Sequence, residues 1–294
     1  MAQYTVSLNR RSLLKMLSVA PLAAASHPSI AFPVEPRKRI AVASYPFRDQ
    51  HIPLTKFAAM VVDRYKIFQI EPLSDHFLSR DAAYLRELRA ANEKAGVTVV
   101  NIPVSLRGSL YDPDESKRAA AIQVSKAWVD AAVAIGSPSV RIHIEGVKGV
   151  APDVDRSAAS LKSIAAYGAE KNVVINLEND DPKSEEAFFL VKVMDKVASP
   201  WLHGLPDFCN SRLIGPDQYN YDAVRAMFEH AYCISHVKDS EVDEGKVYRV
   251  DVDRTFAIAK AAGYHGYFSM EWEGQGDPYT GTQKLIDATL KNLA

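Results

Sequence analysis

The sequence has few cysteines, no long apolar run and no excess of positive charge. Two cysteines among 294 residues cannot build a network of disulfides, which excludes a small disulfide-stabilised fold. The formal net charge of -1 argues against nucleic acid as a partner, because proteins that bind the phosphate backbone need clustered positive charge. The apolar stretch Met16–Ala25 is much shorter than the roughly 20 residues that anchor a chain stably in a membrane. These absences favour a globular protein that binds a small molecule.

The first 31 residues differ from the rest and predict a cleavable signal peptide with a short linker. Arg10 and Arg11 are followed by Ser-Leu-Leu-Lys, an apolar middle and an Ala-Ala-Ala end, an order typical of secretory signals. The arginine pair resembles the twin-arginine signal, which predicts export to the periplasm by the twin-arginine machinery. Cleavage is expected after Ala25 or Ala31, and no cysteine lies near either point to carry a lipid anchor. The alternative is a basic N-terminus that happens to precede an apolar patch.

Residues 32–294 are predicted to form one (β/α)8 barrel, the catalytic domain. Short apolar runs alternate with longer segments in which apolar residues recur at the helical period. The expected strands are Ile40–Tyr45, Ile67–Pro72, Val97–Ile102, Ser139–Ile144, Val173–Glu178, Leu202–Asp207, Cys233–His236 and Tyr267–Glu271. The expected helices include Asp81–Lys94, Glu115–Ile135, Ser157–Glu170, Glu185–Val197, Asp217–Glu229 and Val252–Ala262. Such alternation implies a parallel sheet, and eight units fit a closed barrel. A doubly wound open sheet is the competing fold, but Ala43–Phe47 lacks its glycine-rich turn.

Each of the last four expected strands ends in a residue that can bind a metal ion. These residues are Glu178, Asp207, His236 and Glu271, at intervals of 29, 29 and 35 residues, about one strand–helix unit each. Because catalytic groups in such barrels come from the C-terminal ends of the strands, the four side chains should converge. Three carboxylates in a water-poor pocket need a cation. Three oxygens with one imidazole suit one divalent ion, Mn2+ first, with Mg2+, Co2+ or Zn2+ as alternatives.

Each of these residues alone has an ordinary structural explanation. A single acid at a strand end usually caps a helix or forms a surface ion pair, and a single buried histidine usually belongs to the core. Four candidates at four consecutive strand ends favour the metal site.

A metal ion held by four side chains keeps open positions for two neighbouring oxygens of a substrate. It would polarise a carbonyl and stabilise an enediolate, while a carboxylate on each side moves a proton. The predicted function is therefore an isomerase or epimerase that acts on a sugar, keto-sugar or polyol. The alternative is a lyase or dehydratase, which would use the same site to expel a group beta to the carbonyl.

Three motifs make the sequence similar to the xylose isomerase-like barrel superfamily, the sugar phosphate isomerase/epimerase group. They are Asn176-Leu177-Glu178-Asn179, His236-Val237-Lys238-Asp239 and Gly266-Tyr267-Phe268-Ser269-Met270-Glu271-Trp272-Glu273-Gly274, within a resemblance that covers about residues 40–293. The resemblance implies the same four metal ligands, and it implies that Glu178 and Glu271 are the acid and base of catalysis. It also supports the lyase alternative, since the family includes enzymes that dehydrate inososes and cleave 3-oxidised glycosides. Many relatives have a histidine where this chain has Asn210, which removes one substrate contact.

Five further polar residues are predicted to contact the substrate, namely Glu71, Arg141, His143, Asn210 and Lys238. For Glu71, Arg141 and His143, structural ion pairs are the alternative interpretation. Lys238 could orient a substrate oxygen or pair with a ligand carboxylate.

Two functions from other classes are also considered. An abasic-site endonuclease shares the barrel, but it needs a histidine-rich site with several metal ions and a basic surface. A sugar-binding barrel without catalysis would not need all four ligands. A homo-oligomer is compatible with the sequence, and Cys209 and Cys233 are expected to be free, buried thiols.

Overall fold

The computed structural model describes residues 27–294, so residues 1–26 of the predicted signal peptide lie outside the described part of the chain. Its barrel strands are β1 (Ile40–Ala43), β2 (Gln69–Glu71), β3 (Thr98–Val99), β4 (Pro103–Val104), β5 (Ser139–Ile142), β6 (Val174–Glu178), β7 (Leu202–Leu205), β8 (Ile234–Val237) and β11 (Tyr267–Met270). All neighbouring pairs among these strands are parallel. They form two arcs, in the orders β3-β2-β1-β11-β8 and β4-β5-β6-β7.

The two arcs close into one ring. β3 and β4 are consecutive pieces of the third strand, and the amide of Ile102 between them donates to the Ser139 carbonyl at 3.3 Å. On the other side, bridges join Gly204 to Ala231 and Asp207 to His236, which links β7 to β8. The predicted parallel (β/α)8 barrel is therefore confirmed.

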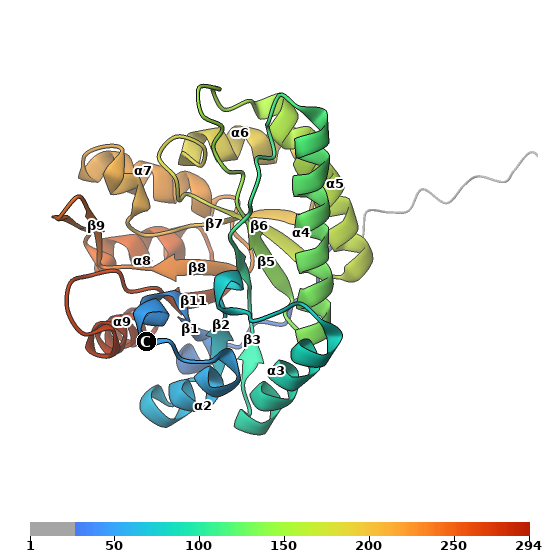
Figure 1. Cartoon of the computed structure of the whole chain (residues 1–294). Coiled ribbons are helices and arrows are strands. Elements are labelled where there is room, and N and C mark those ends of the chain that lie inside the picture. Colours follow the sequence, from blue (N-terminus) through green and yellow to red (C-terminus); the bar gives the residue numbers. More distant parts are fainter. Residues whose placement is uncertain (1–26) are drawn as a thin grey trace, which may run out of the picture.

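Helices surround the strands (Figure 1). They are α2 (Leu54–Tyr65), α3 (Ala82–Ala95), α4 (Glu115–Ile135), α5 (Val154–Lys171), α6 (Ala187–Val197), α7 (Asp217–Phe228), α8 (Val252–Ala261) and α9 (Pro278–Leu293). Short 3-10 turns are η1 (Pro36–Arg39), η2 (Tyr45–Gln50), η3 (Ser74–His76) and η4 (Asn210–Leu213). Glycines in the left-handed region follow three of these helices, namely Gly96 after α3, Gly136 after α4 and Gly263 two residues after α8, with φ values of 68°, 81° and 68°. No helix within residues 27–294 has the length and apolar content of a membrane span.

The core is the apolar inside of the barrel together with the layer between strands and helices. All five residues of β6 are buried, as expected for a parallel strand covered on both faces. Cys209 and Cys233 are both buried and free, as predicted. Most of the observed strands are one to four residues shorter than the apolar runs that predicted them, because backbone pairing stops where the chain leaves the barrel.

An antiparallel hairpin, β9 (Ser240–Asp243) with β10 (Lys246–Arg249), follows β8 and was not predicted. Its sequence is polar and carries no clear alternation of apolar residues, so periodicity gave no strand signal. Glu244 and Gly245 both have left-handed φ values, 47° and 80°, as a two-residue hairpin turn requires. The hairpin lies beside the C-terminal end of β8 (Figure 1).

The N-terminal segment of the described chain packs against the N-terminal end of the barrel, where the strands begin. The hydroxyl of Tyr232 donates to the Pro28 carbonyl at 3.0 Å and accepts from the Ile30 amide at 3.2 Å. The Phe32 ring lies edge-on to Tyr232 and Tyr267, with centroids 5.3 and 5.7 Å apart. These contacts fix residues 28–32 to the starts of β8 and β11.

Candidate metal centre

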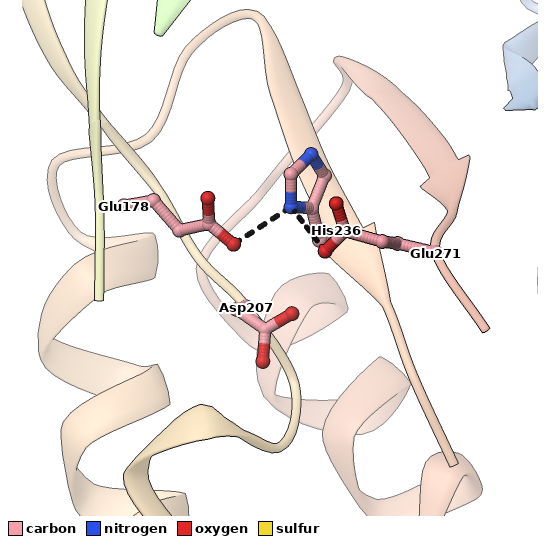
Figure 2. Close-up of side chains that lie close together, drawn as sticks. All are labelled: Glu178, Asp207, His236 and Glu271. Carbon is pink, nitrogen blue, oxygen red and sulfur yellow. Dashed lines mark hydrogen bonds and ion pairs between the residues drawn. The ribbon is translucent and has the colours of Figure 1, made fainter. Parts of the chain in front are cut away.

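The four side chains predicted to bind a metal ion meet at the C-terminal end of the barrel. Glu178 is the last residue of β6, Asp207 lies two residues beyond β7, His236 lies within β8 and Glu271 directly follows β11. All four are buried, and each contributes a ligand atom to a group whose members lie within 4.8 Å of one another. In Figure 2, Glu178 and Glu271 reach toward His236 from opposite sides, with Asp207 below. The strand-end spacing thus brings together the residues that it predicted.

His236 Nδ1 stands between two carboxylates. It lies 2.7 Å from Glu178 Oε1 and 2.9 Å from Glu271 Oε2. Burial lowers the pKa of His236, but the charges of Glu178, Glu271 and Glu71 outweigh it and hold the pKa well above its usual value. Without a cation of another kind, the imidazole itself supplies positive charge between the two acids.

Two carboxylate oxygens in the cluster are buried and accept no hydrogen bond. Asp207 Oδ1 accepts from the backbone amides of Cys209 and Asn210 at 2.8 and 2.7 Å, whereas its Oδ2 has no hydrogen-bond partner. Glu178 Oε2 is likewise without a hydrogen bond, although Arg141 Nε lies 2.9 Å away. Burial also raises the pKa of Asp207 well above its usual value, in spite of the nearby Lys238. Each of these oxygens has a cationic side chain nearby, since Lys238 Nζ lies 3.5 Å from Asp207 Oδ2, but neither accepts a hydrogen bond. Buried carboxylate oxygens that accept no hydrogen bond can bind a divalent cation, so the donor set fits the predicted metal ion.

Asn179 holds the ends of β6 and β7 in register. Its Oδ1 accepts from the Asp207 amide at 2.8 Å, and its Nδ2 donates to the Asp207 carbonyl at 3.2 Å and to Ser211 Oγ at 3.2 Å. The motif that contains Glu178 therefore includes the side chain that fixes the backbone of the next ligand.

Glu71, at the end of β2, lies behind His236 and is fully buried. Its two carboxylate oxygens lie 3.1 and 3.0 Å from His236 Nε2, on the side of the ring away from Glu178 and Glu271. Asn101 Nδ2 donates to Glu71 Oε1 at 2.7 Å, and Ser139 Oγ donates to Asn101 Oδ1 at 2.7 Å. This buried chain fixes the ring and leaves Nδ1 directed at the cluster. Glu71 was predicted to contact substrate, but its position is one side chain further from the cavity.

A cavity of about 350 Å³ opens above the cluster. Four of the residues predicted to contact substrate line it, namely Arg141, His143, Asn210 and Lys238. Its other polar lining residues are Tyr45, Asp75, Ser105, Glu178, Asp180, Glu241, Glu271 and Glu273. The cavity thus places polar and charged groups of both signs around the candidate metal centre.

Lys238 is surrounded by oxygen atoms. Its Nζ donates to Asn210 Oδ1 at 3.0 Å and to Glu241 Oε2 at 3.2 Å, and it also contacts Glu273. Glu271 Oε2 lies 3.3 Å away. Burial lowers the pKa of Lys238, but Asp207, whose Oδ2 lies 3.5 Å away, and these three glutamates raise it well above its usual value, so the ammonium stays charged. Burial also raises the pKa of Glu273 to about 7.

Arg141 and His143 line the side of the cavity nearest Glu178. The Arg141 guanidinium pairs with Glu178 and contacts the His143 ring. His143 Nδ1 lies 2.7 Å from Glu185 Oε2, and Asp180 Oδ2 lies 3.5 Å from His143 Nε2. The charges of Glu178, Asp180 and Glu185 offset the burial of Arg141 and raise its pKa.

Sequence reasoning did not single out Glu241, Glu273 or Tyr45 as parts of this site. Glu273 was open to prediction, since it lies two residues after Glu271 and alternate residues of an extended chain share a side. Glu241 lies on the unpredicted hairpin, and Tyr45 lies in the 3-10 turn after β1. Glu241 had no sequence signal, whereas Tyr45 is the last residue of the expected strand Ile40–Tyr45 and so had the same strand-end signal as the predicted ligands.

Comparisons with known proteins agree with this architecture. A family model described as a xylose isomerase-like TIM barrel matches residues 64–293. No curated protein matches the sequence. Among solved structures, D-allulose 3-epimerase from Methylomonas sp. is similar with a TM-score of 0.70 and 16% identity, over 90% of this chain and 100% of that one.

Two further solved structures represent different reactions on the same fold. The 3-keto-D-glucoside 4-epimerase of E. coli has a TM-score of 0.65 and 13% identity, over 85% of this chain and 98% of that one. The probable 3-DHS dehydratase of Bacillus anthracis has a TM-score of 0.64 and 13% identity, over 84% of this chain and 97% of that one.

Proposed function

Because the chain belongs to the xylose isomerase-like TIM barrel family, we propose that it is a divalent-metal-dependent isomerase or epimerase of a sugar, keto-sugar or polyol. The observation that carries this proposal is the approach of two buried carboxylates, Glu178 and Glu271, to one nitrogen of His236 from opposite sides. The similarity to sugar epimerases of the same fold supports it.

Glu178, Asp207, His236 and Glu271 are the residues that would hold the ion. A bound divalent ion supplies polarisation of a substrate carbonyl and stabilisation of the negative charge that develops on its oxygen. We propose Mn2+ first, with Mg2+, Co2+ or Zn2+ as alternatives, since three carboxylates and one imidazole form a mainly hard donor set.

Glu178 and Glu271 are proposed to move the proton. One carboxylate takes the proton from the carbon next to the carbonyl, so that a C–H bond breaks and its electron pair enters the enediolate. If the opposite acid returns a proton to the other face of that carbon, its configuration inverts and the product is an epimer. If a proton returns to the neighbouring carbon, the product is an isomer with a shifted carbonyl. The substrate's configuration decides which acid accepts the proton.

Lys238, Arg141 and His143 are proposed to orient the substrate. Lys238 and Arg141 are charged donors that line the cavity, and the first lies close to Glu271 while the second lies close to Glu178. Each can therefore donate to a sugar hydroxyl or to the enediolate oxygen next to the acid it contacts. The same contacts keep the two acids in fixed orientations before substrate binds.

Solvent deuterium provides the test. Metal-loaded protein is incubated in D2O with free ketoses, aldoses, polyols and 3-oxidised glycosides, and the products are examined by NMR and mass spectrometry. We expect a product of unchanged skeleton that carries deuterium at one carbon, and a loss of about 10²–10⁴-fold in rate for Glu178→Gln. Glu170→Gln, an exposed acid on α5, is the matched control and should retain the rate. An unchanged rate in Glu178→Gln would contradict the assignment.

A metal-dependent lyase or dehydratase is the second candidate. It is favoured by Lys238, whose ammonium lines the cavity 3.3 Å from Glu271 and could donate a hydrogen bond that stabilises the negative charge on an oxygen leaving from the carbon beta to the carbonyl. The fold likeness to a dehydratase is compatible with this reaction. Product mass separates the candidates, because elimination removes water or an alcohol whereas isomerisation leaves the mass unchanged.

We also propose that the protein is exported by the twin-arginine route to the periplasm. The support is the order of charged, apolar and small residues in the first 31 positions. Cleavage after Ala25 would keep the contacts of Pro28 and Ile30 with Tyr232, whereas cleavage after Ala31 would remove them. We therefore expect the periplasmic chain to begin before Pro28, and mass spectrometry of its N-terminal peptide checks this. Recovery of the uncleaved chain in the cytoplasm alone would contradict export.

A further inference from the structure

A second cavity, of about 670 Å³, adjoins the cavity above the metal centre. We refer to the two as the outer and the inner cavity. Both are lined by His143, Asp180 and Leu213, so these three residues form the border between them. We infer that the outer cavity is a second subsite, and that the substrate is a glycoside or disaccharide whose second unit lies there. This inference rests on the proposed function, since the inner cavity holds the reacting sugar.

The outer cavity has walls that are fixed without a ligand. One wall is the loop after β5, and the other is the loop between β6 and α6. Glu185 joins them, because its Oε1 accepts from the Ile144 amide at 2.7 Å while its Oε2 lies 2.7 Å from His143 Nδ1. The buried Tyr111 hydroxyl accepts from the Val147 amide at 3.1 Å. A preformed cavity loses less entropy when it binds a ligand.

The backbone of the first wall turns sharply to create this space. Glu145 has a φ of 61°, which is uncommon for a residue with a side chain, and Val147 and Val150 then pair in an antiparallel bridge. In the second wall, Asp181 Oδ1 accepts from the amides of Lys183 and Ser184 at 2.9 and 2.7 Å. The loops thus take defined conformations that keep the outer cavity open beside the inner one.

The charges around the outer cavity indicate what it binds. Glu145, Asp180, Asp181 and Glu185 supply four carboxylates, and Lys148 and Lys183 supply two ammonium groups. Four carboxylates disfavour a phosphate or a carboxylate ligand. Groups of both signs around one space offer donors and acceptors to hydroxyls, so the chemistry fits a neutral, hydroxylated unit such as a second sugar.

The volume of the inner cavity also supports a substrate with two sugar units. At about 350 Å³ it lies near the lower end of the range for small-molecule sites, whereas the two cavities together reach the upper end. A free monosaccharide would leave the outer cavity filled with water. A second sugar unit linked past Asp180 would place polar groups against both loops.

Binding measurements test this inference without requiring turnover. Protein loaded with Mn2+ is titrated by calorimetry with D-glucose and D-fructose, and with the reducing disaccharides cellobiose, maltose and lactulose. We expect at least one disaccharide to bind about tenfold or more tightly than either monosaccharide. The inference is overturned if no disaccharide binds more tightly than the monosaccharides.

Gly146 allows the outer cavity to be filled by substitution. A Cβ at this position would lie 3.7 Å from Ser184 Oγ and 3.9 Å from the Tyr111 hydroxyl, which is ordinary contact with two lining residues. Gly146→Leu should therefore reduce disaccharide affinity about tenfold and leave monosaccharide affinity unchanged, while Gly146→Ala serves as the matched control. If Gly146→Leu does not fold, Lys148→Trp provides the same obstruction from an exposed lining position.

The outcomes separate this inference from the proposed function. Turnover of monosaccharides without a preference for disaccharides overturns the second subsite alone. Equal loss of both kinds of ligand in Gly146→Leu, with Gly146→Ala unaffected, also overturns it. Absence of sugar binding and of isomerised or eliminated products overturns both.

Discussion

We expect a divalent ion bound at the candidate metal centre to raise the thermal stability of the protein, and Asp207→Asn to abolish that effect. Asp207 is fully buried in a cluster with two other carboxylates, and its Oδ2 accepts no hydrogen bond, with Lys238 Nζ 3.5 Å away. In the substitution, the amide oxygen can still accept from the amides of Cys209 and Asn210, as Oδ1 does now. The change therefore removes one charge and one ligand oxygen while it preserves the local backbone contacts.

The size of the effect follows from linkage between ion binding and folding. An ion present at 100 times its dissociation constant adds about 2.7 kcal/mol to the free energy of unfolding. For a domain of this size, 1 kcal/mol changes the melting temperature by roughly 2–4 °C, so the ion should raise it by about 5–10 °C. Because burial raises the pKa of Asp207, its ionised form destabilises the ion-free fold at neutral pH. Ion-free Asp207→Asn should therefore melt at the same temperature as the ion-free wild type or above it.

Thermal melts at pH 7.5 with EDTA, Mn2+ or Mg2+ measure these differences. The matched control is Asp180→Asn, because Asp180 lines the same cavity but is not one of the four predicted ligands. The control should keep the full ion-induced shift. A wild-type melting temperature that is the same with EDTA and with saturating ion, or a full shift in Asp207→Asn, would refute the reasoning.

Three further predictions concern other parts of the molecule. Glu71→Gln should weaken metal binding about 10–100-fold, because the His236 ring loses its charged partner at Nε2. Competition with a fluorescent chelator measures the metal affinity, and an unchanged affinity would show that Glu71 does not position the ring. Gly168→Ala should lower the free energy of unfolding by about 1–3 kcal/mol, because the added Cβ would lie 2.5 Å from the Val173 carbonyl oxygen. Urea denaturation measures this, and equal stability of the two proteins would mean that α5 shifts without a cost in free energy. Burial lowers the pKa of His203, so the unfolded chain takes up a proton at this histidine before the folded chain does, and the free energy of unfolding should decrease as the pH falls below about 6.5. The decrease between pH 7.5 and 5 should be smaller in His203→Gln, and identical pH profiles of the two proteins would argue against this.

The fold and the cluster of four candidate ligands were predictable because both depend on patterns local to each strand–helix unit. Glu178, Asp207, His236 and Glu271 each stand at or near the end of an apolar run, and in a closed parallel barrel all such ends meet at one rim. No knowledge of the exact barrel register was needed to place them together.

The surroundings of the cluster were harder to predict, because they depend on contacts across the ring. Glu71 and His236 are 165 residues apart, and only the packing inside the barrel decides that the acid lies behind the ring instead of facing the cavity. Glu241 reaches Lys238 from a hairpin whose polar sequence carries no periodic signal. The outer cavity likewise depends on loop conformations, such as the left-handed φ of Glu145, that residue types do not specify.

The packing of residues 28–32 against the starts of β8 and β11 has a practical consequence. The described N-terminal segment emerges from one end of the barrel, while the cavities open at the other. A carrier protein or a solid support joined ahead of Pro28 would be attached at the end of the barrel where the strands begin, and the two cavities at the other end would stay accessible. The orientation on a surface would thus depend on Tyr232 and Tyr267, the two residues that hold this segment against the barrel.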